Sequence, residues 1–240
     1  MAKASQRAPV LGPAFIRLLA RFKDDATSRA APDVSERLAQ WFDWNRAITL
    51  SRALDNRVPP APEGAAFNEA QDADCARIRA ALVEAIHADI DMTPPRNASP
   101  PADSDAQAAF APYRQHHLKL QRAMQTATGN LRGRLRDMLA RQSPAKARLA
   151  EVDAVMEATL SPREHALLGN VPALLGLHFQ RLYDSNTPAI PADADASETT
   201  AAASNPWLAT FRQDLRIALL AELDVRFHPI EGLLAALRTR

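Results

Sequence analysis

Proline clusters divide this sequence into segments of helical periodicity, and this division restricts the fold more than any other feature. The chain has eighteen prolines and only seven glycines. Most prolines gather between stretches whose apolar residues recur every three or four positions, as on one face of an α-helix. A β-rich chain would need glycine turns and alternating β-branched strands. We therefore predict an all-α fold, an irregular helical bundle of about six to eight helices joined by proline-rich linkers.

Residues 33–54 are predicted to form the helix around which the others pack. This stretch, DVSERLAQWFDWNRAITLSRAL, contains Trp41 and Trp44, two of the three tryptophans in the chain. Its apolar residues fall in two adjoining rows at helical spacing. A helix that is apolar on two adjoining faces is expected to lie between neighbouring helices rather than on the surface.

Changes in composition predict six successive parts of the chain. These are a disordered N-terminus (1–11), an N-terminal helical region (12–91), a proline-rich linker (92–105), a long basic helix with the helices that follow it (106–184), a flexible acidic loop (185–204) and C-terminal amphipathic helices (205–240). Whether the N-terminal and C-terminal helical regions share one core stays open at this point.

Helix boundaries after residue 106 are predicted from seams, caps and prolines. A long helix is expected over 106–142, with a seam of mostly apolar residues recurring every seven positions and a bend or break near Gly129 and Gly133. Ser143 followed by proline predicts the start of the next helix, and Ser161 followed by proline predicts another. A break is expected between Gly169 and Pro172, and Pro229 is expected to separate a short last helix.

The most uneven charge lies between residues 112 and 149, where nine Lys or Arg residues accompany one acid. Residues 63–91 have the opposite bias, with seven acids and two arginines. Pairing between these two stretches within the protein is the simpler interpretation. Contact with nucleic acid or an acidic partner is the alternative. The residues predicted for that contact are Arg132, Arg134, Arg136 and Arg141.

The C-terminal helices form the second predicted contact surface, because they are strongly apolar and follow a long loop. They are expected to dock either on the rest of this chain or on another subunit. Deletion of residues 205–240 is accordingly expected to leave a folded body that has lost its partner. The residues predicted for docking are Phe211, Leu215, Leu219, Leu223, Ile230, Leu233 and Leu234.

No pattern in the sequence indicates catalysis. It has no Gly-rich phosphate loop, zinc-protease helix or nucleophile elbow. Glu84 and His87 form one Glu-x-x-His pair, with Asp91 four residues beyond, whereas a di-iron bundle needs two such pairs. Cys75 is the single cysteine, so an intramolecular disulfide is excluded. We expect a non-enzymatic protein without a metal ion or cofactor.

Charge and hydropathy along the chain give expectations for its location. The formal net charge of +1 points to no particular partner. No apolar run approaches the roughly 18 residues that a membrane-spanning helix needs, and no secretory signal is recognisable. We therefore expect a cytoplasmic protein without a transmembrane segment.

Residues 11–54 resemble a proteobacterial family of proteins of unknown function. The resemblance rests on PAFIRLLARF and on ERLAQWFDWNRAITLSRAL, which matches the pattern ERLxQWxxWxxAIxLSxxL. It implies no catalytic residues. It does imply a cytosolic accessory to a membrane complex, of the kind formed by inner-membrane proton channels of the flagellar-stator type.

Together these observations predict a cytoplasmic helical adaptor or accessory protein that acts through protein–protein contacts. Its expected partner is another protein, such as a component of an inner-membrane complex, and a homo-oligomer is a further alternative. The rival prediction is a nucleic-acid-associated protein that uses the basic residues of 112–149.

Overall fold

The structure is a computed structural model that describes residues 14–23, 44–55, 67–88, 104–186 and 206–239. These ranges contain helices and no strand, so the predicted all-α fold is confirmed. The helices are α1 (Ala14–Lys23), α3 (Trp44–Asp55), α4 (Glu69–His87), α5 (Ser104–Gln142), α6 (Pro144–Gly169), α7 (Val171–Asn186) and α8 (Pro206–Arg238).

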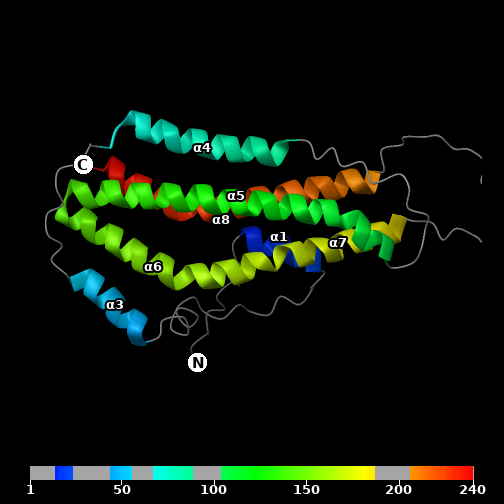
Figure 1. Ribbon diagram of the computed structural model, residues 1–240, viewed down its shortest axis with the longest axis horizontal. Coiled ribbons are helices and arrows are strands. Elements are labelled where there is room, and N and C mark those ends of the chain that lie inside the picture. Colours follow the sequence, from blue (N-terminus) through cyan, green and yellow to red (C-terminus); the bar gives the residue numbers. More distant parts are fainter. Residues whose placement is uncertain (1–13, 24–43, 56–66, 89–103, 187–205, 240) are drawn as a thin grey trace, which may run out of the picture.

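The two longest helices, α5 and α8, run side by side through the middle of the bundle (Figure 1). Helices α6 and α7 follow one another along one side of this pair, and α4 lies along the other side. Helix α1 packs against α7 and α8, and α3 lies against α6. Helices α5 and α8 therefore form the central contact of the fold.

One hydrophobic core joins the N-terminal and C-terminal helices. Phe15 and Phe22 of α1 and Ile86 of α4 belong to the same buried cluster as the apolar side chains of α5, α7 and α8. Aromatic rings gather where α5, α7 and α8 meet, with Phe179 and Phe211 in edge-to-face contact at 4.9 Å between ring centroids. The question left open by the sequence is therefore settled for α1 and α4, which share one core with α5, α7 and α8.

The predicted seam of the long helix is confirmed. Tyr113, His117, Leu120 and Met124 are all buried on one side of α5. The helix continues without a break through the two glycines, where a bend or break was expected. Packing against α6 and α8 offsets the low helix propensity of the two glycines.

Two of the predicted helix boundaries are confirmed. Ser143 caps α6, since its side-chain oxygen accepts from the backbone N–H of Lys146 at 3.2 Å and Pro144 occupies the first turn. Helix α6 ends at Gly169 and α7 begins at Val171, where a break was expected.

The two boundaries predicted from Pro162 and Pro229 are wrong. Helix α6 continues through Pro162, and α8 continues through Pro229. A proline removes one backbone hydrogen bond but ends a helix only when packing does not hold both halves in line. Phe227 and Ile230, on either side of Pro229, are both buried and hold the two halves of α8 against the same core.

The prediction that residues 33–54 form the central helix is wrong for the part that the structure describes. Helix α3 lies at the edge of the bundle against α6, and its buried side chain is Ala53 (Figure 1). Trp44 is 79% exposed and Leu54 is 51% exposed. The apolar periodicity identified a helix, but a dense apolar stripe does not by itself determine that another helix covers it.

Several predicted segments lie partly or wholly outside the described residues. These are the N-terminus (1–11), most of the linker (92–103), most of the acidic loop (187–204) and the first part of the predicted central helix (33–43). At the edges that can be compared, α5 already begins at Ser104 and α7 extends to Asn186.

Replacing Gly176 with alanine is expected to lower the free energy of unfolding by about 1–2 kcal/mol. A Cβ atom there would lie 3.0 Å from Cε1 of Phe110. That ring is held by Phe179 and Phe211, so it has little freedom to move away. Urea denaturation measures the change. The control is Gly133→Ala, where a Cβ atom meets nothing within 4 Å and a gain of up to about 1 kcal/mol is expected.

Candidate functional site

The residues predicted for docking on a partner lie in the protein's own core. Four of them are fully buried, Phe211, Leu215, Leu219 and Ile230. The other three, Leu223, Leu233 and Leu234, are nearly so. As a surface for a separate partner this prediction is wrong, because α8 packs along α5 and α4 instead of extending beyond the bundle. Docking within the chain was the other alternative, and the structure has that arrangement.

Two of the four arginines predicted for nucleic acid contact instead hold α5 to α6. Arg132 donates from Nε and Nη2 to both carboxylate oxygens of Asp153, at 2.9 and 2.7 Å. Arg136 contacts the same carboxylate at 3.4 Å and also pairs with Glu157. Both arginine side chains are largely buried. Partly buried pairs of this geometry are structural, so these side chains are not surface contacts in this structure.

The other two predicted arginines lie further out. Arg134 pairs with Asp74 of α4 at 3.1 Å, which confirms one link between the acidic and basic stretches. Arg141 is exposed on the last turn of α5. The acidic stretch also pairs with α8, since Asp72 accepts from Arg238 at 2.5 Å. Oppositely charged residues therefore do pair within the chain, but the partners include residues of α6 and α8 as well as those of α4 and α5.

A stripe of polar residues runs along α5, and it was not predicted from the sequence. Its members are spaced by three or four positions, so they lie on one face of the helix. They are His117, Gln121, Gln125, Thr128, Arg132 and Arg136. Opposite them, α6 contributes Asp153, Glu157 and Glu164, and α8 contributes Glu222 and Arg226. The spacing was visible in the sequence, but the acids that face the stripe come from other helices, α6 and α8.

Facing this stripe is a buried ion pair within α8, between Glu222 and Arg226. Glu222 has no exposed side-chain surface, and Arg226 is 8% exposed. Glu222 accepts from Nε and Nη2 of Arg226 at 3.0 and 2.8 Å, and from Gln121 of α5 at 3.2 Å. Burial raises the pKa of Glu222, and Arg226 and Gln121 oppose that effect. The hydrogen bond from Gln121 therefore links α5 to the buried ion pair of α8.

His117 lies beside this pair as a neutral imidazole. Its Nε2 is 3.8 Å from Oε2 of Glu222, and neither ring nitrogen has a hydrogen-bond partner among the described residues. The pKa of His117 is lowered to about 4, chiefly by burial and also by the nearby His116 and Arg226. The contact with Glu222 is therefore not an ion pair at neutral pH.

His117 is expected to make the protein less stable in mild acid. The unfolded chain takes up a proton on this residue below about pH 6.5, whereas the folded protein does so only near pH 4. The stability from this group is therefore present above about pH 6.5 and falls by about 3 kcal/mol as the pH drops toward 4. The raised pKa of Glu222 acts in the opposite direction.

Comparing wild type with His117→Leu isolates this contribution, because Glu222 is present in both proteins. Urea denaturation across pH 4–7 measures the free energy of unfolding of both proteins. The value for wild type is expected to fall relative to that of the variant as the pH falls. A difference that stays constant over this range would show that His117 is not buried in its neutral form.

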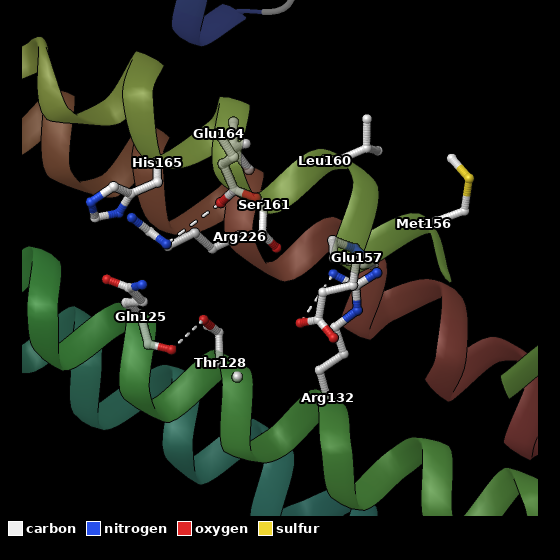
Figure 2. Close-up of a pocket in the computed structure, with 13 residues that line it drawn as sticks. Gln125, Thr128, Arg132, Met156, Glu157, Leu160, Ser161, Glu164, His165 and Arg226 are labelled. Atoms are coloured by element: carbon white, nitrogen blue, oxygen red, sulfur yellow. Dashed lines mark hydrogen bonds and ion pairs between the residues drawn. The ribbon is translucent and has the colours of Figure 1, made fainter. Parts of the chain in front are cut away.

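A pocket of about 430 Å³ opens between α5, α6 and α8, next to the buried ion pair (Figure 2). The charged groups that line it are Arg132 and Arg226, with Glu157 and Glu164. Figure 2 shows the side chains of α5 on one wall and those of α6 on the other. The remaining lining residues are Gln125, Thr128, Gly129, Met156, Leu160, Ser161, His165, Val225 and Pro229.

The other candidate residues do not assemble into a site within the described residues. Glu84 and His87 are both exposed near the end of α4, and Asp91 lies outside the described residues. Among the described side chains, no three His, Cys, Asp or Glu residues are grouped to hold a metal ion. Cys75 is buried, and burial raises its pKa, so it is held as the thiol.

Comparison with known proteins places the chain in a family. None of its described helices is long and apolar enough to cross a membrane. No curated protein and no solved structure matches the chain. The model of the family described as "Protein of unknown function (DUF3348)" matches residues 1–239, and the chain belongs to this family.

Proposed function

We propose that this protein is a non-enzymatic helical adaptor that binds a protein partner through the outward face of α3. The proposal rests on the exposure of Trp44. This residue, one of three tryptophans in the chain, is 79% exposed. Large aromatic side chains are mostly buried in a monomer, and tryptophan is enriched among the residues that dominate binding energy at interfaces.

The position of α3 supports this function. The helix is anchored by Ala53 against α6, while Leu54 remains 51% exposed. Burying apolar side chains of an amphipathic helix against a partner is a common mode of protein recognition. The apolar side chains of α8, by contrast, are already used in the core.

The proposed partner is a component of an inner-membrane complex, and the proposed location is the cytoplasm. Both rest on the resemblance of residues 11–54 to a proteobacterial family with the ERLxQWxxWxxAIxLSxxL pattern. Helix α3 contains the second half of this pattern, from Trp44 to Leu54.

Photocrosslinking in the native cells tests the proposal directly. A photoreactive phenylalanine analogue placed at position 44 is expected to capture a defined protein. The matched control places the same analogue at Leu177, an exposed leucine of α7 that is 59% exposed. Capture at both positions alike, or at neither, would contradict a partner surface on α3.

Nucleic acid binding stays a separate prediction, and its test should use residues that do not hold the fold together. Arg114, Lys119 and Arg122 are exposed on α5. If nucleic acid binds along α5, changing these three to glutamate is expected to weaken binding and reduce its dependence on salt. Binding to a mixed-sequence duplex is measured by fluorescence anisotropy at several salt concentrations. Unchanged affinity in the triple variant would exclude this surface.

A further inference from the structure

The pocket between α5, α6 and α8 is lined by positive and negative groups in equal number. Arg132 and Arg226 supply two guanidinium groups, and Glu157 and Glu164 supply two carboxylates. Neutral hydrogen-bonding side chains lie between them. These are Gln125, Thr128 and Ser161, and the apolar part of the wall is Met156, Leu160, Val225 and Pro229.

Each arginine is fixed along one edge of its guanidinium group. Asp153 accepts from Nε and Nη2 of Arg132 at 2.9 and 2.7 Å. Glu222 accepts from Nε and Nη2 of Arg226 at 3.0 and 2.8 Å. Because two bonds hold each planar group in place, the position of the remaining nitrogen, Nη1, is also fixed.

Each Nη1 atom has a glutamate nearby, but at a distance that leaves the contact weak. Nη1 of Arg226 lies 3.5 Å from Oε1 of Glu164, and Nη1 of Arg132 lies 3.6 Å from Oε1 of Glu157. Figure 2 shows the first of these pairs beside His165 and the second at the other end of the pocket. N–H···O hydrogen bonds are usually about 2.7–3.2 Å long, so a ligand oxygen can compete for either nitrogen.

The two glutamates differ in how firmly they are held. Glu157 also pairs with Arg136, which keeps its carboxylate in place. Glu164 is 39% exposed, and its contact with Arg226 is the long one described above. The Arg226–Glu164 end is therefore the one that can open to admit a ligand, while the Arg132–Glu157 end forms a fixed wall.

We propose that this pocket binds a small zwitterion, a molecule with a carboxylate and an ammonium group close together, such as a free amino acid. Its carboxylate accepts from Nη1 of Arg226, and its ammonium group donates to Glu164. A ligand with only one charge would pair with just one of these two groups, whereas a zwitterion pairs with both Nη1 of Arg226 and the carboxylate of Glu164. The volume of about 430 Å³ is within the range of small-molecule sites.

Matched ligands test the charge pattern of the pocket. Binding of the common L-amino acids to the full chain is measured by isothermal titration calorimetry. The tightest ligand is then compared with its N-acetyl derivative, which keeps only the carboxylate, and with its amide, which keeps only the ammonium group. Each derivative is expected to bind at least about tenfold more weakly, since it loses a hydrogen bond to a charged group. Equal binding of either derivative, or no binding of any amino acid, would overturn the proposal.

Two glycines of α5 provide matched variants that test the location. Gly129 lines the pocket, and a Cβ atom there would meet nothing within 4 Å. Gly133 is equally open but does not line the pocket. Gly129→Leu is expected to fill the pocket and abolish binding, whereas Gly133→Leu is expected to retain it. Retained binding in the first variant, or loss in both, would overturn the assignment.

Glu164→Gln tests the ammonium contact without removing a core group. This variant is expected to bind the amino acid about tenfold more weakly, because an amide replaces the carboxylate that faces the ammonium group. Unchanged affinity would overturn the proposed orientation. No residue of α3 lines the pocket, so these results do not depend on the proposed adaptor function.

Discussion

Replacing Glu222 with alanine is expected to lower the free energy of unfolding by about 3–5 kcal/mol. The change removes the carboxylate that holds Nε and Nη2 of Arg226, and it leaves that guanidinium group buried with its closest partner gone. Gln121 of α5 loses an acceptor at the same time. A buried charge without its partner costs far more than a surface ion pair contributes.

Two further variants separate the charge from the packing at this position. Glu222→Gln keeps the shape and an acceptor oxygen, so its cost should be clearly smaller than that of Glu222→Ala. A double variant with leucine at both Glu222 and Arg226 removes both charges and should recover much of the loss. Urea denaturation at pH 7 gives all three values. A cost below about 1 kcal/mol for Glu222→Ala would mean that the pair is exposed in solution.

Replacing Phe211 with alanine is expected to cost about 3–5 kcal/mol of stability. Its ring is fully buried and makes edge-to-face contacts with Tyr113, at 5.4 Å between centroids, and with Phe179, at 4.9 Å. The variant would leave a cavity where α5, α7 and α8 meet. Deletion of residues 205–240 should therefore unfold the protein, contrary to the expectation from sequence that a folded body would remain.

The control for Phe211 is Ile217→Ala on the same helix, where the side chain is 38% exposed. Ile217→Ala should lower the free energy of unfolding by at least about 2 kcal/mol less than Phe211→Ala does, because it leaves no comparable cavity. Thermal and urea denaturation followed by circular dichroism measure both. Equal and small effects would show that α8 does not form the centre of the core.

Local signals predicted the helices well because they act through the chain's own neighbours. The seam of α5 follows from apolar spacing, and the start of α6 follows from the capping hydroxyl of Ser143. Pro162 and Pro229 led to wrong predictions because their effect does not depend on local sequence alone. Whether a proline ends a helix depends on the packing of both halves, which local sequence does not contain.

The arrangement of the helices depended on contacts that no local pattern contains. Residues 33–54 have the densest large apolar content, yet the described part lies at the edge of the bundle with Trp44 exposed. Arg132 and Arg136 were interpreted as a basic surface because their acidic partners, Asp153 and Glu157, lie on the next helix. The polar stripe on α5 had a visible period, but only the acids of α6 and α8 identify it as an interior feature.

The adaptor proposal is tested most directly by quantitative affinity purification of the full chain from its native cells, with solubilised membranes and with nuclease treatment. Wild type is compared with a variant that carries serine at both Trp44 and Leu54, and with Leu177→Ser as the matched surface control. We expect a defined protein partner that is still recovered after nuclease treatment and with the Leu177 variant, and that is lost with the α3 variant. Recovery of the same proteins by all three, or of partners that disappear with nuclease, would contradict it.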